Sequence, residues 1–178
     1  MKSMSNTKKL TITGVCVALC IVLPVAFHVI PNAGSIYCPI HIPVLLCGII
    51  CGWDFGLLCG LLGPVLSCVL SQMPPVAMLP SMMVELAAYG AITGIFMRII
   101  KTKNLYADLY ISLTIALILG RVVAGVSRAL IFSAGSYSFA VWVSSYFFIS
   151  WPGIIIQLVF IPSIVIALEK AKLIEKRY

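Results

Sequence analysis

Six polar residues lie inside or beside long apolar stretches of this chain, where they could bind a small molecule. The sequence has 178 residues, of which 62% are hydrophobic and 10% are charged. An ionisable side chain in such a stretch is costly to bury, so each one is a functional candidate. The candidates are Glu85, Arg121, Arg128, Gln157, His28 and His41.

The two arginines define the chemistry that this set could perform. Arg121 and Arg128 are seven residues apart, so they project from nearly the same face of a helix. Two arginines against the single acid Glu85 leave a net positive charge, and a guanidinium pairs well with a carboxylate in bidentate geometry. The pattern therefore predicts a site for a small anion, with a carboxylate as the leading candidate.

A purely structural interpretation of the same residues is also open. Glu85 and Arg128 could form an ion pair that only holds the fold together, while Arg121 donates to backbone carbonyls. His28 and His41 could each cap a helix end. The aromatic residues near the last apolar stretch have two interpretations as well, because they could form an interfacial belt or stack against a ring of the substrate. They are Tyr137, Trp142, Tyr146 and Trp151.

Several other kinds of chemistry are not indicated. The chain has no Walker A sequence and no HExxH motif, so neither ATP hydrolysis by this chain nor a zinc protease site is predicted. Glu85 with His28 or His41 is the only pairing that could resemble a catalytic acid and base. Six of the seven cysteines lie in apolar segments and are interpreted as small packing residues, with Cys38 in a loop. We expect no enzyme activity, no metal and no cofactor.

The elements that must position these residues are membrane-spanning helices. A soluble domain of this size carries about 25% charged residues, so the low charge indicates a lipid environment. Breakers containing Pro, Gly and Ser separate apolar runs, and the first run is too long for a signal peptide. The sequence predicts one all-α domain over residues 1–178, with helices over 9–30, 39–52, 55–71, 81–101, 107–132 and 146–170.

The stretch 39–71 could be one helix or two, and the basic residues decide between them. As one helix it would be about 50 Å long, well beyond a hydrocarbon core of about 30 Å. Ten of the 12 basic residues form three clusters, and the loops 31–38, 72–80 and 133–145 have none. Placing all three clusters in the cytoplasm requires an even number of spans between them. This predicts six spans, both termini in the cytoplasm, and a turn at 52–56. The clusters are Lys2, Lys8 and Lys9; Arg98, Lys101 and Lys103; and Lys170, Lys172, Lys176 and Arg177.

This topology places most of the candidate residues toward the outside. Arg128, Glu85, His28 and His41 fall in the external half, whereas Arg121 and Gln157 fall near the middle of the membrane. The uncharged loops lie at the same side, so we expect a pocket that opens outward. The net charge of +7 is then explained by basic residues beside anionic lipid headgroups, and no nucleic-acid partner is expected.

Small residues four apart form a surface near the cytoplasmic end of the first helix. Gly14 and Ala18, with Thr11 and Thr13, would suit the docking of another membrane protein, and packing within the bundle is the alternative.

Several stretches resemble the substrate-binding (S) components of energy-coupling factor (ECF) transporters, in particular those for vitamins. These are HIPVLLCG at 41–48, GLLCGLLGP at 56–64, Met-Pro-Pro at 73–75 and ELAAYG at 85–90. The resemblance implies a prokaryotic cell-membrane protein that captures a micronutrient from outside. It also implies a transmembrane coupling protein and two ATPase subunits as partners.

The resemblance further implies roles for particular positions. The family contacts its coupling protein through an Ala-x-x-x-Ala-like pattern in the first span, which here reads Gly14 to Ala18. Its ligand is held by external loops and the last three spans. That corresponds to Glu85, Arg121, Arg128 and Gln157, with the loop around Asn32 at 32–34.

The function expected is uptake of an anionic vitamin, with pantothenate-, folate- or nicotinate-like acids as candidates. The alternatives are a solitary secondary transporter of a small carboxylate and, in another class, an intramembrane enzyme or scaffold.

Overall fold

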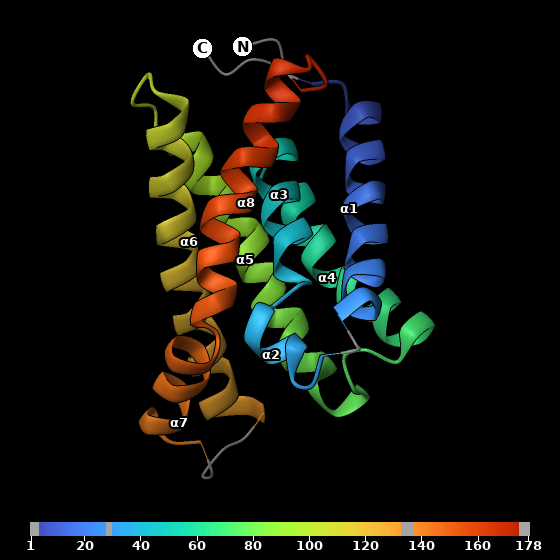
Figure 1. The fold of residues 1–178 in the computed structure, drawn as a ribbon, viewed down its shortest axis with the longest axis vertical. Helices are drawn as coiled ribbons and strands as arrows, with labels where there is room; N and C mark the ends of the chain where they lie inside the picture. Colours follow the sequence, from blue (N-terminus) through green and yellow to red (C-terminus); the bar gives the residue numbers. More distant parts are fainter. Residues whose placement is uncertain (1–3, 28–29, 133–136, 175–178) are drawn as a thin grey trace.

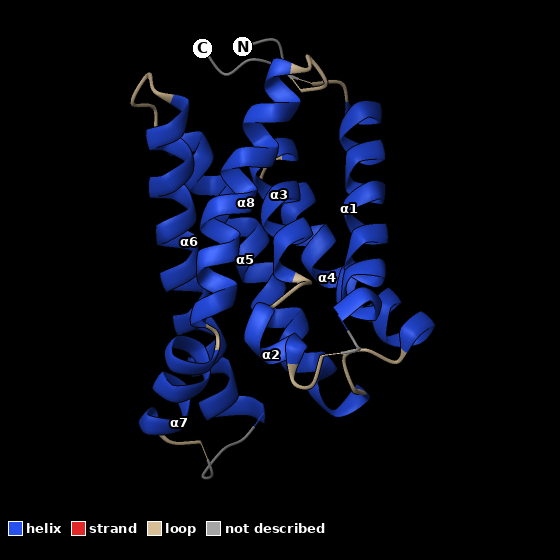
Figure 2. Ribbon diagram, viewed as in Figure 1, coloured by secondary structure: helices blue, strands red, loops and turns tan. Residues whose placement is uncertain are grey.

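The protein is a bundle of helices. The computed structural model describes residues 4–27, 30–132 and 137–174, and these contain helices and loops without a β-strand (Figure 2). The long helices are α1 (Asn6–Phe27), α3 (His41–Cys51), α4 (Trp53–Ser71), α5 (Leu79–Ile99), α6 (Leu105–Ser127) and α8 (Trp151–Lys170). The short ones are α2 (Ala33–Tyr37), the 3₁₀ turn η1 (Val76–Met78), the π-helical turn η2 (Arg128–Phe132), α7 (Phe139–Val143) and the π-helical turn η3 (Ser144–Ile149).

Six helical segments within the described residues are long and apolar enough to cross a membrane. The predicted all-α membrane fold with six spans is therefore confirmed. The second of these segments joins α2 and α3, and the third is α4. The break between them is at Gly52, whose φ of 102° is a conformation that other residues rarely adopt. The prediction of two helices within 39–71 is confirmed.

The helices run alternately up and down, so their ends separate into two groups. In Figure 1, the start of α1, the α5–α6 connection and the end of α8 lie at one end of the bundle, while α2 and α7 lie at the other. Lys9 at the start of α1 lies 5.6 Å from the ring centroid of Phe55, which places the α3–α4 break at the first of these ends. The described basic residues of the three clusters therefore share one end.

Glycines hold α3, α4 and α5 in close contact. A Cβ atom on Gly90 would collide with the backbone of Gly56, and one on Gly48 would collide with the carbonyl oxygen of Gly90. Gly60 and Gly94 face backbone atoms of the neighbouring helix in the same way. We call Gly48, Gly56, Gly60, Gly90 and Gly94 the glycine seam. Such close backbone approach is a common means of helix association in lipid.

Helix α1 lies at the edge of the bundle and packs on α3 and α4 through thiols (Figure 1). Cys16, Cys20, Cys47, Cys51 and Cys59 are buried in this contact and none forms a disulfide. Cys38 instead lies between α2 and α3, where its thiol donates to the Ser35 carbonyl.

Two parts of the helix prediction were wrong. The last long helix begins at Trp151 rather than at 146, because a separate π-helical turn occupies 144–149. The segments 31–38 and 133–145 were expected to be external loops, yet they contain α2 and α7. The fifth span ends at Phe132 as predicted, although its regular helix stops at Ser127 and a π-helical turn forms the remainder.

Candidate substrate-binding site

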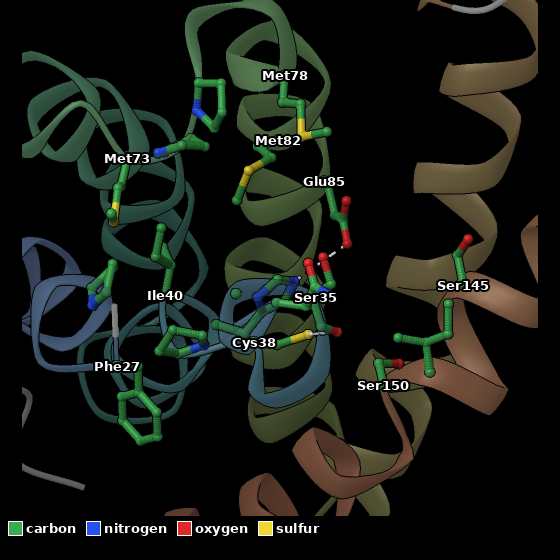
Figure 3. Close-up of a pocket in the computed structure, with 18 of the residues that line it drawn as sticks. Phe27, Ser35, Cys38, Ile40, Met73, Met78, Met82, Glu85, Ser145 and Ser150 are labelled. Carbon is green, nitrogen blue, oxygen red and sulfur yellow. Dashed lines mark hydrogen bonds and ion pairs between the residues drawn. The ribbon is translucent and has the colours of Figure 1, made fainter. Parts of the chain in front are cut away.

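A cavity of about 730 Å³ opens at the end of the bundle that carries α2 and α7. Its wall comes from four parts of the chain, namely the segment from the end of α1 to the start of α3, the segment from the end of α4 into α5, the end of α6 with η2, and η3. Its size is that of sites for drug-sized ligands. Figure 3 shows part of this wall.

Glu85 is the centre of a polar network in the cavity wall. Its Oε1 accepts a hydrogen bond from Nε2 of His41 at 3.3 Å, and its Oε2 accepts one from the Tyr146 hydroxyl at 2.9 Å. Nη2 of Arg128 lies 3.5 Å from the same Oε2. The carboxylate is buried, and three groups from α3, η2 and η3 converge on it.

Arg128 is only partly engaged by this carboxylate. The 3.5 Å separation from Glu85 is long for a charge-assisted hydrogen bond, which is usually 2.7–2.9 Å. Its Nε is buried and has no hydrogen-bond partner among the described residues. The guanidinium also lies 5.5 Å from the Tyr146 ring centroid, in a cation–π contact. Arg128 therefore retains donor capacity at the cavity.

Arg121 has a different environment, because no carboxylate lies within salt-bridge distance of it among the described residues. Its side chain is anchored by two backbone carbonyls, with Nε donating to Tyr146 at 2.9 Å and Nη1 donating to Leu117 at 2.9 Å. The residue is only 4% exposed and it lines the cavity. A buried charge without a counter-ion is unfavourable, so this position favours an anion in the cavity.

The contacts required by the purely structural interpretation of these residues are partly found. Glu85 and Arg128 do pair, and Arg121 does donate to carbonyls, as that alternative requires. These contacts do not remove the residues from the cavity, since all three line it. The contacts hold the two guanidinium groups in fixed positions at the cavity. The three side chains together still carry a net positive charge.

His41 is the first residue of α3, and its buried ring contacts Glu85 and Tyr89. Because Glu85 can only accept, Nε2 of His41 carries the proton in their hydrogen bond. The ring packs edge-on against Tyr89, with centroids 5.0 Å apart. Its Nδ1 is buried and has no partner among the described residues.

The remaining predicted residues are distributed differently. Asn32 lines the cavity from the loop before α2, whereas Gln157 and Trp151 do not line it. Gln157 is 1% exposed within the bundle, about 9 Å along α8 from Trp151. Trp151 is 58% exposed at the start of α8, which favours the interfacial interpretation of this residue. His28 lies outside the described residues.

The sequence interpretation missed the central role of Tyr146. Its hydroxyl donates to Glu85, and its carbonyl accepts from both Arg121 Nε and Ser150 Oγ. Burial raises the pKa of the Tyr146 phenol, and the negative charge of Glu85 adds to this rise, so the hydroxyl keeps its proton. The only signal in the sequence was its membership of the aromatic group at 137–151. Tyr89 was also missed, although it follows Glu85 by one helical turn.

The small-residue surface of α1 is on the outside of the bundle. Gly14 and Ala18 are exposed, and a Cβ atom on Gly14 would have no neighbour within 4 Å. Thr13, which was expected on this surface, is buried, and its hydroxyl lies 3.4 Å from Sγ of Cys47. Internal packing therefore explains Thr13 but not Gly14.

The sequence also matches a known family over most of its length. The family model described as the substrate-specific component of ECF transporters matches residues 8–168. No curated protein matches the chain. The six spans, the cavity among their ends and this match agree with the resemblance seen in the local stretches. The chain belongs to the substrate-specific components of ECF transporters, a family of multi-pass membrane proteins that take part in the uptake of vitamins and other micronutrients.

Proposed function

We propose that this protein captures a monoanionic micronutrient from outside the cell for ATP-driven uptake. The observation that carries the proposal is Arg121, a buried guanidinium at the cavity with no acid beside it among the described residues. The side chains of Arg121, Arg128 and Glu85 together carry one net positive charge, which a single carboxylate would neutralise. Among the candidate acids, nicotinate- and pantothenate-like molecules carry one carboxylate, whereas folate-like molecules carry two.

The direction of capture follows from the distribution of charge. The end of the bundle that holds the described basic residues of the three clusters is the end that favours the cytoplasm. The cavity opens at the opposite end, which is therefore external in this proposal. The exposed surface around Gly14 and Ala18 is proposed as the contact with the transmembrane coupling protein, which works with two ATPase subunits in this family.

The first experiment identifies the ligand and tests Arg121. Native mass spectrometry of the purified protein is expected to show a co-purified small acid. Arg121→Gln is expected to lower affinity for that acid by about tenfold to more than a hundredfold, the usual range for losing a charge-assisted hydrogen bond in a buried site. The matched control is Arg98→Gln. Arg98 is an exposed arginine in the last turn of α5, and it does not line the cavity.

Isothermal titration calorimetry provides the affinities, and circular dichroism shows whether each variant keeps its helices. A folded Arg121→Gln protein that binds the acid as tightly as the original would contradict the proposal. A co-purified cation or neutral molecule would contradict it as well.

A second experiment separates this function from that of a solitary secondary transporter. The protein alone in vesicles is expected to bind the acid without accumulating it. Accumulation is expected only when the coupling protein, the ATPase subunits and ATP are present. Uptake by the protein alone, driven by an ion gradient, would favour the secondary transporter instead.

A further inference from the structure

The cavity has two chemically different sides. The charged residues Glu85, Arg121 and Arg128 come from α5, α6 and η2. The other side is lined by apolar side chains from α1, the α4–α5 connection and the start of α5. In Figure 3, Phe27, Ile40 and Met73 lie on one side of the view, Glu85, Ser145 and Ser150 on the other, and Met78 and Met82 between them. Pro31, Pro74 and Pro75 also line the cavity, and Pro74 and Pro75 follow Met73 directly.

The residues that line the cavity lie at different depths. Met78, Met82, Glu85 and Tyr89 all line the cavity and succeed one another at intervals of three or four residues, as expected for one helix face. With a rise of 1.5 Å per residue, Glu85 lies about 10 Å deeper than Met78 and Tyr89 about 16 Å deeper. By the same measure, Arg121 on α6 lies about 10 Å deeper than Arg128, the first residue of η2. Glu85 is thus deeper than Met78 and Met82, and Arg121 is the deeper of the two arginines.

Three methionines give the apolar side a particular character. Met73, Met78 and Met82, which we call the methionine wall, are each partly accessible in the cavity. Methionine has a flexible, polarizable thioether that adapts to the shape of an apolar partner and contacts aromatic rings favourably. The adjacent prolines have no N–H to offer a ligand. Asn32 and Gln72 are the polar side chains that line the cavity next to these residues, so a hydroxyl-rich ligand body would find few partners on this side.

We propose that the substrate is an amphipathic monocarboxylate that binds acid first, with its apolar body against the methionine wall. This inference rests on the proposed function, because it assigns the acid to Arg121 and Arg128. It adds the substrate class and the residues that select it. The methionine wall excludes acids whose body is strongly hydrated, and Arg121 excludes apolar molecules without an acid.

The test compares two carboxylates with the same number of non-hydrogen atoms. The probes are 2-naphthoate, with an apolar aromatic body, and gluconate, with a hydroxyl-rich body. Naphthalene-2-carboxamide serves as the uncharged analogue. Calorimetry with the ligand-free protein in detergent is expected to show 2-naphthoate binding at least about tenfold more tightly than either of the others, since burying its body removes apolar surface from water.

Substitutions on α5 locate the effect. Met82→Gln is expected to weaken 2-naphthoate binding about tenfold, because the amide must lose its hydration against an apolar body. Met82→Leu should retain most of the affinity. Met83→Gln is the matched control, since Met83 is the next residue on the helix and does not line the cavity.

Each result distinguishes this inference from the proposed function. Equal or tighter binding of gluconate, with both acids dependent on Arg121, would overturn the amphipathic substrate and leave anion capture intact. Binding of 2-naphthoate that is unchanged by both Arg121→Gln and Met82→Gln would overturn both. No binding of 2-naphthoate at millimolar concentration would overturn the inference, whatever the co-purified ligand proves to be.

Discussion

At the scale of single residues, Tyr146 connects the parts of the site to one another. Its hydroxyl reaches Glu85 on α5, and its carbonyl receives Nε of Arg121 on α6. The carbonyl belongs to the π-helical turn η3, and such turns are frequent at functional sites. The position of the buried guanidinium therefore depends on a residue from a short segment between α7 and α8.

We expect Tyr146→Phe to lower the free energy of unfolding by about 1–3 kcal/mol, because a buried carboxylate oxygen loses its hydrogen bond. Thermal unfolding in detergent, followed by circular dichroism, provides the measurement. Tyr110→Phe is the control, since Tyr110 is exposed on α6. Equal effects of the two substitutions would show that the bond to Glu85 contributes nothing.

The sequence predicted the charged part of the site better than its surroundings. Arg121 and Arg128 could be placed together because a spacing of seven residues fixes a shared helix face. Gln157 could not be placed, since its position in the sequence indicates its depth in the membrane but not which side of α8 meets the cavity. Tyr146 was hidden because its partners are 25 and 61 residues away, and no local pattern encodes such contacts.

At the scale of the elements, the glycine seam brings the backbones of α3, α4 and α5 into close contact. We expect Gly90→Ala to lower the free energy of unfolding by about 1–3 kcal/mol or more, because its Cβ would collide with the Gly56 carbonyl. Gly14→Ala adds the same methyl group where nothing lies within 4 Å, so its effect is expected within about 0.5 kcal/mol. Unfolding in a denaturing detergent measures both, and a tolerated Gly90→Ala would refute the seam.

Long helices were predictable because lipid demands about 20 apolar residues for each span. The short helices were not, since α2 and α7 each have five residues and no periodic signal of that length is readable. The start of α8 was placed five residues early because the apolar run 146–149 continues into it. Pro152 carried the correct signal, since proline favours the first turn of a helix.

At the scale of the whole molecule, the proposed orientation can be tested with fusions. A green fluorescent protein joined after Tyr178 is expected to fluoresce, and alkaline phosphatase at the same point is expected to be inactive, because both report a cytoplasmic position for that end. The reverse pattern would place the cavity at the cytoplasmic face and contradict capture from outside.

The exposed surface around Gly14 and Ala18, proposed as the contact with the coupling protein, leads to a separate prediction. Gly14→Leu is expected to reduce co-purification with the coupling protein and to leave binding of the acid unchanged, because the added bulk projects from the outside of the bundle, opposite the buried face of α1. Ser163→Leu, at an exposed position on α8, is the control. Normal assembly of the Gly14→Leu protein would exclude this surface as the contact.

The cavity is walled by segments 24–41, 72–89, 121–128 and 145–150, which lie far apart along the chain. A substrate in it would contact several of them at once, and it would do so only in the folded protein. Ligand at a hundred times its dissociation constant then adds about 2.7 kcal/mol to the free energy of unfolding. The bound nutrient would therefore stabilise the fold itself. The lifetime of the protein in the membrane would then depend on the supply of the molecule that it collects.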